Sequence, residues 1–302
     1  MTYYSENTII YNNGQFVKAA EAKIDLYSQS MHYGYSVFEG IRSYKTVDGS
    51  TKIFKAVEHF QRLQASAESL NMPYTWLVEE LIEATYKVLA DNNLGDAYIR
   101  PLVYGPANMS FNQNTESYIT IQAWEMAPFL GDKLLRVMTS SFQRPNPKGF
   151  KITAKAGGHY VNSIMASQEA KANGFDEALL TDMEGFAAEA PGANVFYEKD
   201  GKLFTPSLGN ILPGITRATV LKICYDLNIE VVEKRFTVDE MYGTDAAFFC
   251  GTAAEVIGIE SIDNHLFTTN WNDTVSRQIQ LLYKNLVTEN KEVVMNEILG
   301  VE

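Results

Sequence analysis

Apolar residues recur at helical spacing in several stretches of the chain. Between Val57 and Leu70 they fall on one face, and Pro73 shortly afterwards ends the helix that this spacing predicts. A second stretch of the same kind runs from about Trp76 to Ala90. The remaining predicted helices are 161–172, the stretch after Gly214, and 273–289.

Strands are predicted where apolar and polar residues alternate, or where short apolar runs end at turn residues. The sequences Asn12-Asn13-Gly14 and Asp48-Gly49 favour hairpins, because they are turns that connect antiparallel strands. The other predicted strands are 97–104, 118–124, 134–141, 178–182, 194–199, 203–206, 246–250 and 256–262.

The predicted strand over 97–104 carries a candidate carboxylate receptor. Alternate residues share a face of a strand, so Tyr98 and Arg100 point the same way. Arginine offers a fork of donors and tyrosine adds one more. The alternative is a surface arginine beside a packing tyrosine. Pro101, which lacks an N–H, indicates that this strand lies at an edge or contains a bulge.

The length of the chain predicts more than one domain. At 302 residues it exceeds the size at which one core usually stops growing, so two domains are expected. The stretch EMAPFLGDK, residues 125–133, is typical of a linker. We therefore expect a smaller domain over 1–124 and a larger one over 134–302.

Charge narrows the class of partner. The chain has 37 Asp and Glu residues against 25 Lys and Arg, a formal net charge of −12. An acidic surface repels phosphate backbones and anionic lipids, so neither nucleic acid nor membrane is an expected partner. No apolar stretch is long enough to cross a bilayer, and the N-terminus has no signal-peptide pattern. We expect a cytoplasmic protein.

Cysteine and histidine suggest no metal site. Cys224 and Cys250 are far apart in sequence, and the four histidines form no paired motif. We expect two buried free thiols in a reducing compartment and no bound metal.

The run ITAKAGGHYVNS, residues 152–163, holds the first candidate for chemistry. It surrounds Lys155 with alanine and glycine, so we expect room beside the lysine for a flat molecule. A lysine amine is protonated at neutral pH, but burial or a nearby cation can free it to react with a carbonyl. The alternative is a small-residue loop with a solvated lysine, which is the commoner case for an arbitrary lysine.

Three other features bear on a binding site. Glu189 stands among alanines before a bend, and a shielded carboxylate needs a cationic or N–H partner, such as a pyridinium nitrogen. The backbone amides after Gly214 start a helix and can bind an anion, although an ordinary threonine cap explains Thr216 equally well. Phe38 and Gly40 suit an apolar pocket wall, or the core of an ordinary hairpin.

Six blocks, taken together, resemble one family. HYGYSVFEGIR, HFQRL, AYIRPL, AKAGGHY, LPGITR and GTAAE occur in this order across nearly the whole chain. In this they resemble the branched-chain amino acid aminotransferases of pyridoxal phosphate fold type IV. The resemblance implies an α/β fold of two domains, a smaller N-terminal α/β domain and a larger C-terminal pseudo-barrel.

The resemblance also implies an activity. It is a ping-pong transfer of the amino group between L-leucine, L-isoleucine or L-valine and 2-oxoglutarate, with pyridoxal 5′-phosphate as cofactor. The small-molecule partners are then amino acids and 2-keto acids. The protein partner is a second copy of the chain, in a homodimer or an oligomer of dimers.

The same resemblance assigns roles to residues that match the motifs. Lys155 resembles the lysine that holds the cofactor covalently and later moves the substrate proton. The other expected cofactor contacts are Tyr160 at the phenolic oxygen, Glu189 at the pyridine nitrogen, and Arg62, Ile215, Thr216 and Thr252 at the phosphate. The expected substrate contacts are Tyr98, Thr252 and Ala253 at the α-carboxylate with Arg100 close by, and Phe38, Gly40 and Tyr33 at the side chain. Tyr33 is a candidate for donation by the other subunit.

Departures from the family pattern bear on the substrate range. Ala188 and Ala190 flank the acid where serine and glycine are common, His159 replaces a frequent asparagine, and Met126 lies roughly where a pocket tryptophan is often found. Two alternatives stay open: another fold type IV reaction, such as D-amino acid transamination or aminodeoxychorismate lysis, and a non-catalytic dimeric binding protein. The Tyr98 and Arg100 pair disfavours the first alternative, and the intact lysine disfavours the second.

Overall fold

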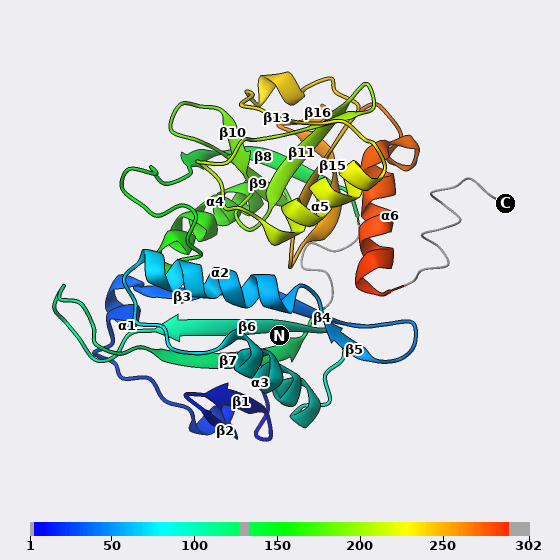
Figure 1. Cartoon of the computed structure of the whole chain (residues 1–302). Coiled ribbons are helices and arrows are strands. Elements are labelled where there is room, and N and C mark those ends of the chain that lie inside the picture. Colours follow the sequence, from blue (N-terminus) through cyan, green and yellow to red (C-terminus); the bar gives the residue numbers. More distant parts are fainter. Residues whose placement is uncertain (1–2, 127–132, 290–302) are drawn as a thin grey trace. The chain divides into compact units, whose positions relative to one another are not determined.

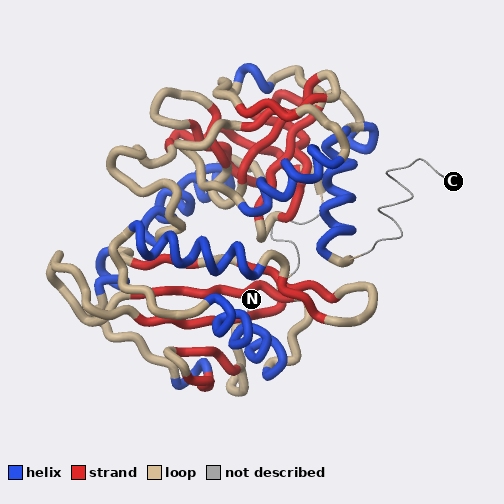
Figure 2. The backbone as a smooth tube through the Cα atoms, viewed as in Figure 1, coloured by secondary structure: helices blue, strands red, loops and turns tan. Residues whose placement is uncertain are grey.

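The computed structural model describes residues 3–126 and 133–289 of the chain (Figures 1 and 2). Contacts group the chain into unit 1, which is Met1–Ala127 with Thr153–His159, and unit 2, which is Pro128–Ile152 with Tyr160–Glu302. The segment Thr153–His159, which contains Lys155, thus packs with the N-terminal unit, although it follows the predicted linker in sequence. That linker, 125–133, lies mostly outside the described residues, and the predicted domain boundaries stay a prediction.

Unit 1 is built on an antiparallel sheet. Within the described residues it has seven strands in the order β2-β1-β7-β6-β4-β5, with β3 also paired to β6. The strands are β1 (Ile9–Asn12), β2 (Gln15–Lys18), β3 (Ser36–Phe38), β4 (Ile41–Lys45), β5 (Thr51–Ile53), β6 (Ala97–Tyr104) and β7 (Tyr118–Glu125). The helical segments are η1 (Ala19–Glu21), α1 (Gln29–Tyr33), α2 (Ala56–Ser69), α3 (Val78–Asp91) and η2 (Gly157–His159).

The core of unit 1 lies between the sheet and the helices α2 and α3, which pack over it (Figure 1). Phe60 and Leu63 of α2 and Leu81 of α3 are fully buried, and they pack in one cluster with Ile99 and Ile121 of the central strands. Burial of large apolar side chains contributes roughly 1.5–3 kcal/mol each. The helical spacing read from the sequence therefore identified both helices, within two residues at each end.

Unit 2 contains a sheet that closes on itself. Its described strands number nine, in the order β10-β9-β8-β15-β14-β11-β12-β13, and β10 also pairs with β11. That extra pairing joins the two sides of the sheet into a closed ring, as in a barrel. The strands are β8 (Leu135–Gln143), β9 (Glu177–Thr181), β10 (Ala187–Glu189), β11 (Asn194–Lys199), β12 (Lys202–Thr205), β13 (Val231–Glu233), β14 (Ala246–Gly251), β15 (Glu255–Ile262) and β16 (His265–Leu266).

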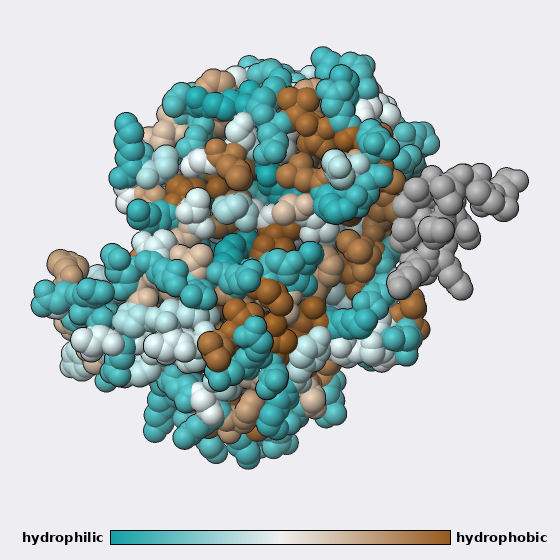
Figure 3. Space-filling view, in the orientation of Figure 1, coloured by the Kyte–Doolittle hydropathy of each residue, from teal (hydrophilic) through white to brown (hydrophobic). Residues whose placement is uncertain are grey.

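Helices pack on the outside of this sheet. The helix α4 lies against β8 and β9, whereas α5 and α6 contact each other and β14. The helical segments of unit 2 are α4 (Tyr160–Ala172), α5 (Ile215–Asp226), η3 (Asp239–Met241), η4 (Trp271–Asp273) and α6 (Val275–Val287). Hydrophilic side chains dominate the face drawn in Figure 3, with apolar ones scattered between them.

The predicted turns and strand pairs are confirmed, but the prediction for Pro101 is wrong. The strand β6 is interior, and it pairs with β7 along its whole length. On its other side β3 pairs with one end and β4 with the other. Pro101 lies opposite the break between them, where Glu39 N donates to Pro101 O at 2.9 Å. Because no partner there requires an N–H, an interior strand accommodates the proline.

The short helix α1 is not among the helices that the sequence predicts. Ser28 accepts a hydrogen bond from the N–H of Ser30, and Gly34 ends the helix at φ 65°. A serine cap and a left-handed glycine are ordinary helix signals. With only five residues between them, the helix is too short to show an apolar period.

No helix in the described ranges is long and apolar enough to span a membrane. Likewise, His, Cys, Asp and Glu side chains of these ranges form no group of three that could hold a metal ion. Both cysteines, Cys224 and Cys250, are free and buried.

A buried carboxylate joins α6 to the sheet of unit 2. Glu198 of β11 accepts hydrogen bonds from Val275 N at 3.0 Å, from Ser276 N at 2.8 Å and from Ser276 Oγ at 2.7 Å. The first amides of a helix have no partner within it, and the helix dipole favours a negative charge there. Glu198 therefore caps α6 from another element.

We predict that Glu198→Gln destabilises unit 2 by about 2–4 kcal/mol, because an amide group replaces a charged acceptor of buried N–H groups. Thermal unfolding followed by circular dichroism should show a midpoint lower by several degrees. Glu260→Gln, an exposed change on β15, is the matched control and should leave the midpoint unchanged. Equal midpoints for the two variants would contradict the capping role.

Candidate functional site

Lys155 is fixed in unit 1 through its backbone. Its N–H donates to Ser66 Oγ of α2 at 3.1 Å, and its carbonyl accepts from Phe38 N at 3.0 Å. The next residue, Ala156, forms an isolated bridge with Val37. The lysine amine itself lies 4.9 Å from the centre of the Phe38 ring. Three contacts to two elements thus hold a segment that has no regular structure of its own.

Glycines of this run allow other protein segments to approach closely, and the expected room beside Lys155 for a flat molecule stays a prediction. A Cβ on Gly157 would collide with Ser36 Oγ. Gly158 N donates to Gly34 O at 3.0 Å, and a Cβ on Gly34 would lie 2.7 Å from Gly158 Cα. The glycines therefore allow two backbone segments to touch, and this contact contributes to holding the lysine.

A buried acid stands beside Phe38. Glu39 is fully buried, accepts from Arg62 Nε at 2.7 Å and Nη2 at 2.9 Å, and lies 2.7 Å from His59 Nδ1. Burial alone would raise the pKa of Glu39, but Arg62 and His59 outweigh it and hold that pKa at about 2. Burial lowers the pKa of His59, against the opposing effect of Glu39. The carboxylate therefore stays ionised across the neutral pH range and fixes one side of the Arg62 guanidinium.

Tyr98 and Arg100 share a face of β6, as predicted from the alternation. Arg100 Nη2 lies 3.3 Å from the Tyr98 hydroxyl, and the guanidinium lies over Phe38 at 4.5 Å and near Trp124 at 6.0 Å. Arg100 Nε and Trp124 Nε1 are buried without an acceptor among the described residues. Two unpaired donors in an aromatic setting suit a ligand with an acceptor group, and a guanidinium favours a carboxylate.

Gly40 lies against the Tyr98 phenol, and its place in the pocket wall stays a prediction. A Cβ on Gly40 would overlap the Tyr98 hydroxyl. Gly40 thus provides the space in which the phenol lies.

Tyr33 lies apart from this cluster, at the surface of unit 1. It is 46% exposed, donates to Met109 O at 3.3 Å, and packs on Phe111 with ring centres 5.4 Å apart. The side chain of Tyr33 thus contacts the loop that carries Met109 and Phe111.

Glu189, at the end of β10 in unit 2, is a second buried carboxylate, with 5% of its surface exposed. Arg144 Nε lies 2.9 Å from one of its oxygens. Asn194 Nδ2 donates to the other at 3.0 Å, and Leu212 N donates to both at 3.1 and 3.2 Å. The predicted need for cationic and N–H partners is met here by the protein itself.

Asn194 ties this carboxylate to the start of α5. Besides Glu189, its amide group donates to Leu212 O at 3.1 Å, and a Cβ on Gly214 would collide with its side-chain oxygen. The cap residue Gly214 has no side chain to occupy the first amides of α5, which begins at Ile215. With Thr216 beside them, these amides have the arrangement at which helix starts commonly bind anions.

The turn between β14 and β15 lies next to this arrangement. Gly251 packs on the bend after Glu189, where its Cβ would meet Gly192 O at 2.9 Å. Thr252 and Ala253 follow in the turn, which closes at Glu255 with φ 56°, an uncommon value for a residue with a side chain. Unit 2 thus gathers Glu189, the α5 start and this turn, while Tyr160 opens α4.

Four residues of the candidate site were not predicted from the sequence. They are Glu39, His59, Arg144 and Asn194. Only Glu39 left a local signal, an acid directly after the apolar Val37-Phe38 pair. Arg144 and Asn194 act on Glu189 from other strands, and their roles depend on the pairing of those strands.

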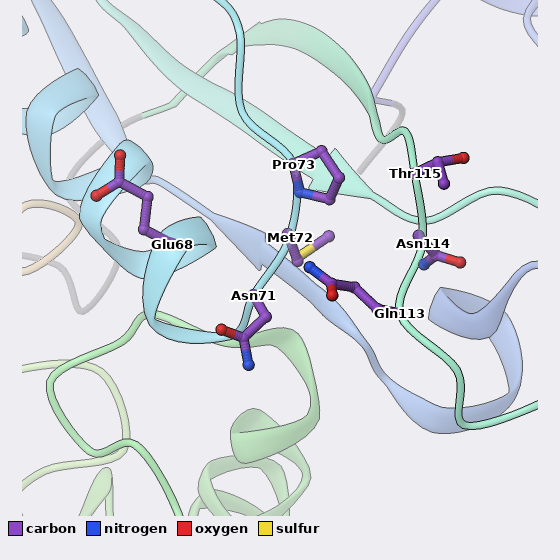
Figure 4. A pocket seen from close by; sticks show the side chains of 7 residues that line it. All are labelled: Glu68, Asn71, Met72, Pro73, Gln113, Asn114 and Thr115. Carbon is purple, nitrogen blue, oxygen red and sulfur yellow. The ribbon is translucent and has the colours of Figure 1, made fainter.

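One pocket of unit 1 is separate from these residues. It has a volume of about 610 Å³ and lies between the end of α2 and the loop that follows β6 (Figure 4). The lining residues are Glu68, Asn71, Met72, Pro73, Gln113, Asn114 and Thr115. None of the predicted site residues lines it.

Comparison with known proteins decides the family. A sequence model of the family described as amino-transferase class IV matches residues 36–262, which is most of the chain. The chain belongs to the class IV aminotransferases. The branched-chain-amino-acid aminotransferase of Pseudomonas aeruginosa is 38% identical over 298 residues, which cover 97% of each chain.

Solved structures of the class IV aminotransferases agree. The branched-chain aminotransferase of Thermoproteus uzoniensis, solved with norvaline, matches with a TM-score of 0.90 at 35% identity over 94% of this chain and 96% of its own. The branched-chain enzyme of Thermobaculum terrenum, solved in its PLP-form, matches with a TM-score of 0.88 at 33% identity over 97% and 98%. The family resemblance and the two-domain α/β architecture of fold type IV are confirmed.

For this aminotransferase we predict that Gly40→Ala displaces the Tyr98 phenol. The KM for the amino acid should rise at least about tenfold, because the new methyl group occupies the place of the hydroxyl. Gly149→Ala, where a Cβ makes only an ordinary contact of 3.6 Å, is the matched control. An unchanged KM in Gly40→Ala would show that the Tyr98 hydroxyl takes no part in substrate binding.

Proposed function

We propose that this chain is a branched-chain amino acid aminotransferase. It transfers the amino group between L-leucine, L-isoleucine or L-valine and 2-oxoglutarate, with pyridoxal 5′-phosphate as cofactor and ping-pong kinetics. The observation that carries the proposal is Lys155, held at three backbone positions with its amine beside Phe38. The similarity to branched-chain enzymes over nearly the full length supports the substrate class.

The residues present fit pyridoxal phosphate. Glu189 is a buried, hydrogen-bonded carboxylate, which suits a protonated ring nitrogen. The α5 start, with glycine at its cap, suits a phosphate. In unit 2 we assign Tyr160 to the phenolic oxygen and Ile215, Thr216 and Thr252 to the phosphate. In unit 1 we assign Lys155 to the aldehyde and Arg62, oriented by its ion pair with Glu39, to the phosphate.

Lys155 and Glu189 would have separate roles in this reaction. Pyridoxal phosphate, when bound, supplies an aldehyde that captures amines and a ring that takes up the electron pair left by a departing α-proton. Lys155 is the base that accepts this proton and later returns it. Glu189 keeps the ring nitrogen protonated, and its charge favours the state in which the ring takes up electrons.

The Tyr98 and Arg100 pair supports a substrate that combines a carboxylate with an apolar chain. The unpaired donors of Arg100 and Trp124 suit the acid group, and Phe38 offers an apolar surface next to them. We assign the α-carboxylate to Tyr98, Thr252 and Ala253 with Arg100 close by. We assign the substrate side chain to Phe38, Gly40 and Tyr33.

A homodimer, or an oligomer of dimers, belongs to the same proposal. Phe111 is 90% exposed and packs against Tyr33, and such exposed aromatic pairs are typical of an interface. In unit 2, α4 exposes a further apolar set formed by Val161, Ile164 and Met165. A second copy of the chain would cover these side chains, and Tyr33 would then reach the partner.

The proposed compartment is the cytoplasm. Cys224 and Cys250 are free and buried, and free thiols are the usual state in a reducing compartment. Amino acids and 2-keto acids, the small-molecule partners proposed here, are consistent with that location.

We predict that the purified protein, with pyridoxal phosphate and 2-oxoglutarate, forms keto acids from L-leucine, L-isoleucine and L-valine. A steady-state panel should include D-alanine and aminodeoxychorismate, which test the other fold type IV reactions. Lys155→Ala should reduce turnover by at least about 10³-fold, because the proton-transfer base is lost. Lys151→Ala, an exposed neighbour, is the control. No keto acid from L-leucine would refute the proposal.

We predict that Phe111→Asp weakens self-association at least about tenfold, because a charge replaces an interface aromatic. Sedimentation velocity at micromolar concentration should show dimers or larger species for the native chain and a shift toward monomer for the variant. Leu266→Asp, at an exposed position of β16, is the control. A native chain that is monomeric and fully active in dilute solution would contradict the dimer.

A further inference from the structure

Arg144 is a buried cation to which the proposed function gives no task. It follows β8 directly, and its N–H donates to Thr181 O of β9 at 2.8 Å. The guanidinium is 2.9 Å from a Glu189 oxygen, and 8% of the Arg144 side chain and 6% of the Glu189 side chain are exposed. Both charges of the pair are therefore withdrawn from water.

We propose that Arg144 is a positioning residue that keeps Glu189 ionised and correctly oriented. The inference rests on the proposed function, in which the negative charge of Glu189 holds a proton on the ring nitrogen of the cofactor. Arg144 itself acts through Glu189.

The surroundings of Glu189 make a cation necessary. Its sequence neighbours are alanines, and Ala187, Ala188 and Ala190 are all buried. Moving an isolated carboxylate into such a setting is costly, and the usual outcome is that the group takes up a proton. A neutral carboxyl group would not stabilise a positive ring nitrogen. Arg144 prevents that outcome by supplying the opposite charge at ion-pair distance.

Two further partners orient Glu189 without adding charge. Asn194 Nδ2 and the backbone N–H of Leu212 are neutral donors that occupy the carboxylate from the side of α5. They fix the orientation of the carboxylate. A cation favours the ionised form of the carboxylate more strongly than these neutral donors do.

Several charged groups on or next to β9, β11 and α5 have partners of their own. Asp182 pairs with Arg235 at 3.0 Å, Arg217 with Glu233 at 2.6 Å, Glu198 with the start of α6, and Glu177 with the N–H of Ala178. Arg144 therefore supplies positive charge directly at the Glu189 carboxylate.

The kinetic test compares Arg144→Met, Arg144→Lys and the native holoenzyme with L-leucine and 2-oxoglutarate between pH 5.5 and 9. Without the cation, the carboxyl pKa rises, so Glu189 is neutral at low pH and ionised again at high pH. In Arg144→Met, kcat/KM should fall roughly tenfold or more at pH 6 but no more than about threefold at pH 8.5. Arg144→Lys should restore most of the loss at pH 6.

A second readout needs no catalysis. The chain without added cofactor is unfolded by heat at several pH values. In Arg144→Met the folded-state pKa of Glu189 lies above its unfolded value, so stability falls as the pH rises from about 4.5 through that folded pKa. The difference in unfolding midpoint between Arg144→Met and the native chain should therefore grow between pH 5 and pH 7. Arg136→Met, an exposed arginine on β8 that pairs with Asp176 at 3.5 Å, should show no such trend.

The outcomes separate this inference from the proposed function. A loss in Arg144→Met that is equal at all pH values, with no recovery in Arg144→Lys, overturns the positioning role even if the enzyme transaminates leucine. If the Met variant does not fold, Arg144→Gln replaces it, because it also removes the charge. In a Glu189→Gln background, Arg144→Met should add less than about threefold to the loss. Full activity of Glu189→Gln itself would instead refute the role of Glu189 in the proposed function.

Discussion

Two buried carboxylates impose the strictest constraint on this protein. An ionised acid inside a protein needs a cation, hydrogen-bond donors or both around it. Glu39 obtains them from Arg62 and His59 in unit 1, and Glu189 obtains them from Arg144, Asn194 and the Leu212 amide in unit 2. Each cluster joins elements that are distant in sequence, so each also fixes the geometry of its own unit. The proposed chemistry uses this geometry.

Much of the fold could be predicted from local patterns. The helix α2 follows from its apolar face, and the first hairpin follows from Asn13-Gly14, where both residues have positive φ. The sequence-based predictions fail where a neighbouring element determines the local structure. Pro101 is tolerated because β3 and β4 leave a break opposite it, which no sequence pattern of β6 reveals. The helix α1 is set by a cap and a glycine and is too short for a period.

The candidate site was predictable where chemistry is local to a motif. Lys155 and Glu189 stand out because each is an ionisable residue among small apolar ones. The role of the small residues was only partly predicted, because Gly157 and Gly158 also admit the backbone of Gly34 and the side chain of Ser36. The partners of the ionised groups were missed for the same reason. A contact such as that of Arg144 with Glu189 arises from strand pairing, and single-sequence motifs do not contain it.

The central claim is that Lys155 is the residue that carries the cofactor. The most direct measurement is reduction of the holoenzyme with borohydride, followed by digestion and mass spectrometry of the peptides. Reduction fixes the cofactor permanently to the amine that holds it. The account predicts one phosphopyridoxyl group, on Lys155, in the peptide that contains the AKAGGHY sequence. A label on Lys148 or Lys151 instead, or no label on a chain loaded with the cofactor, would contradict it.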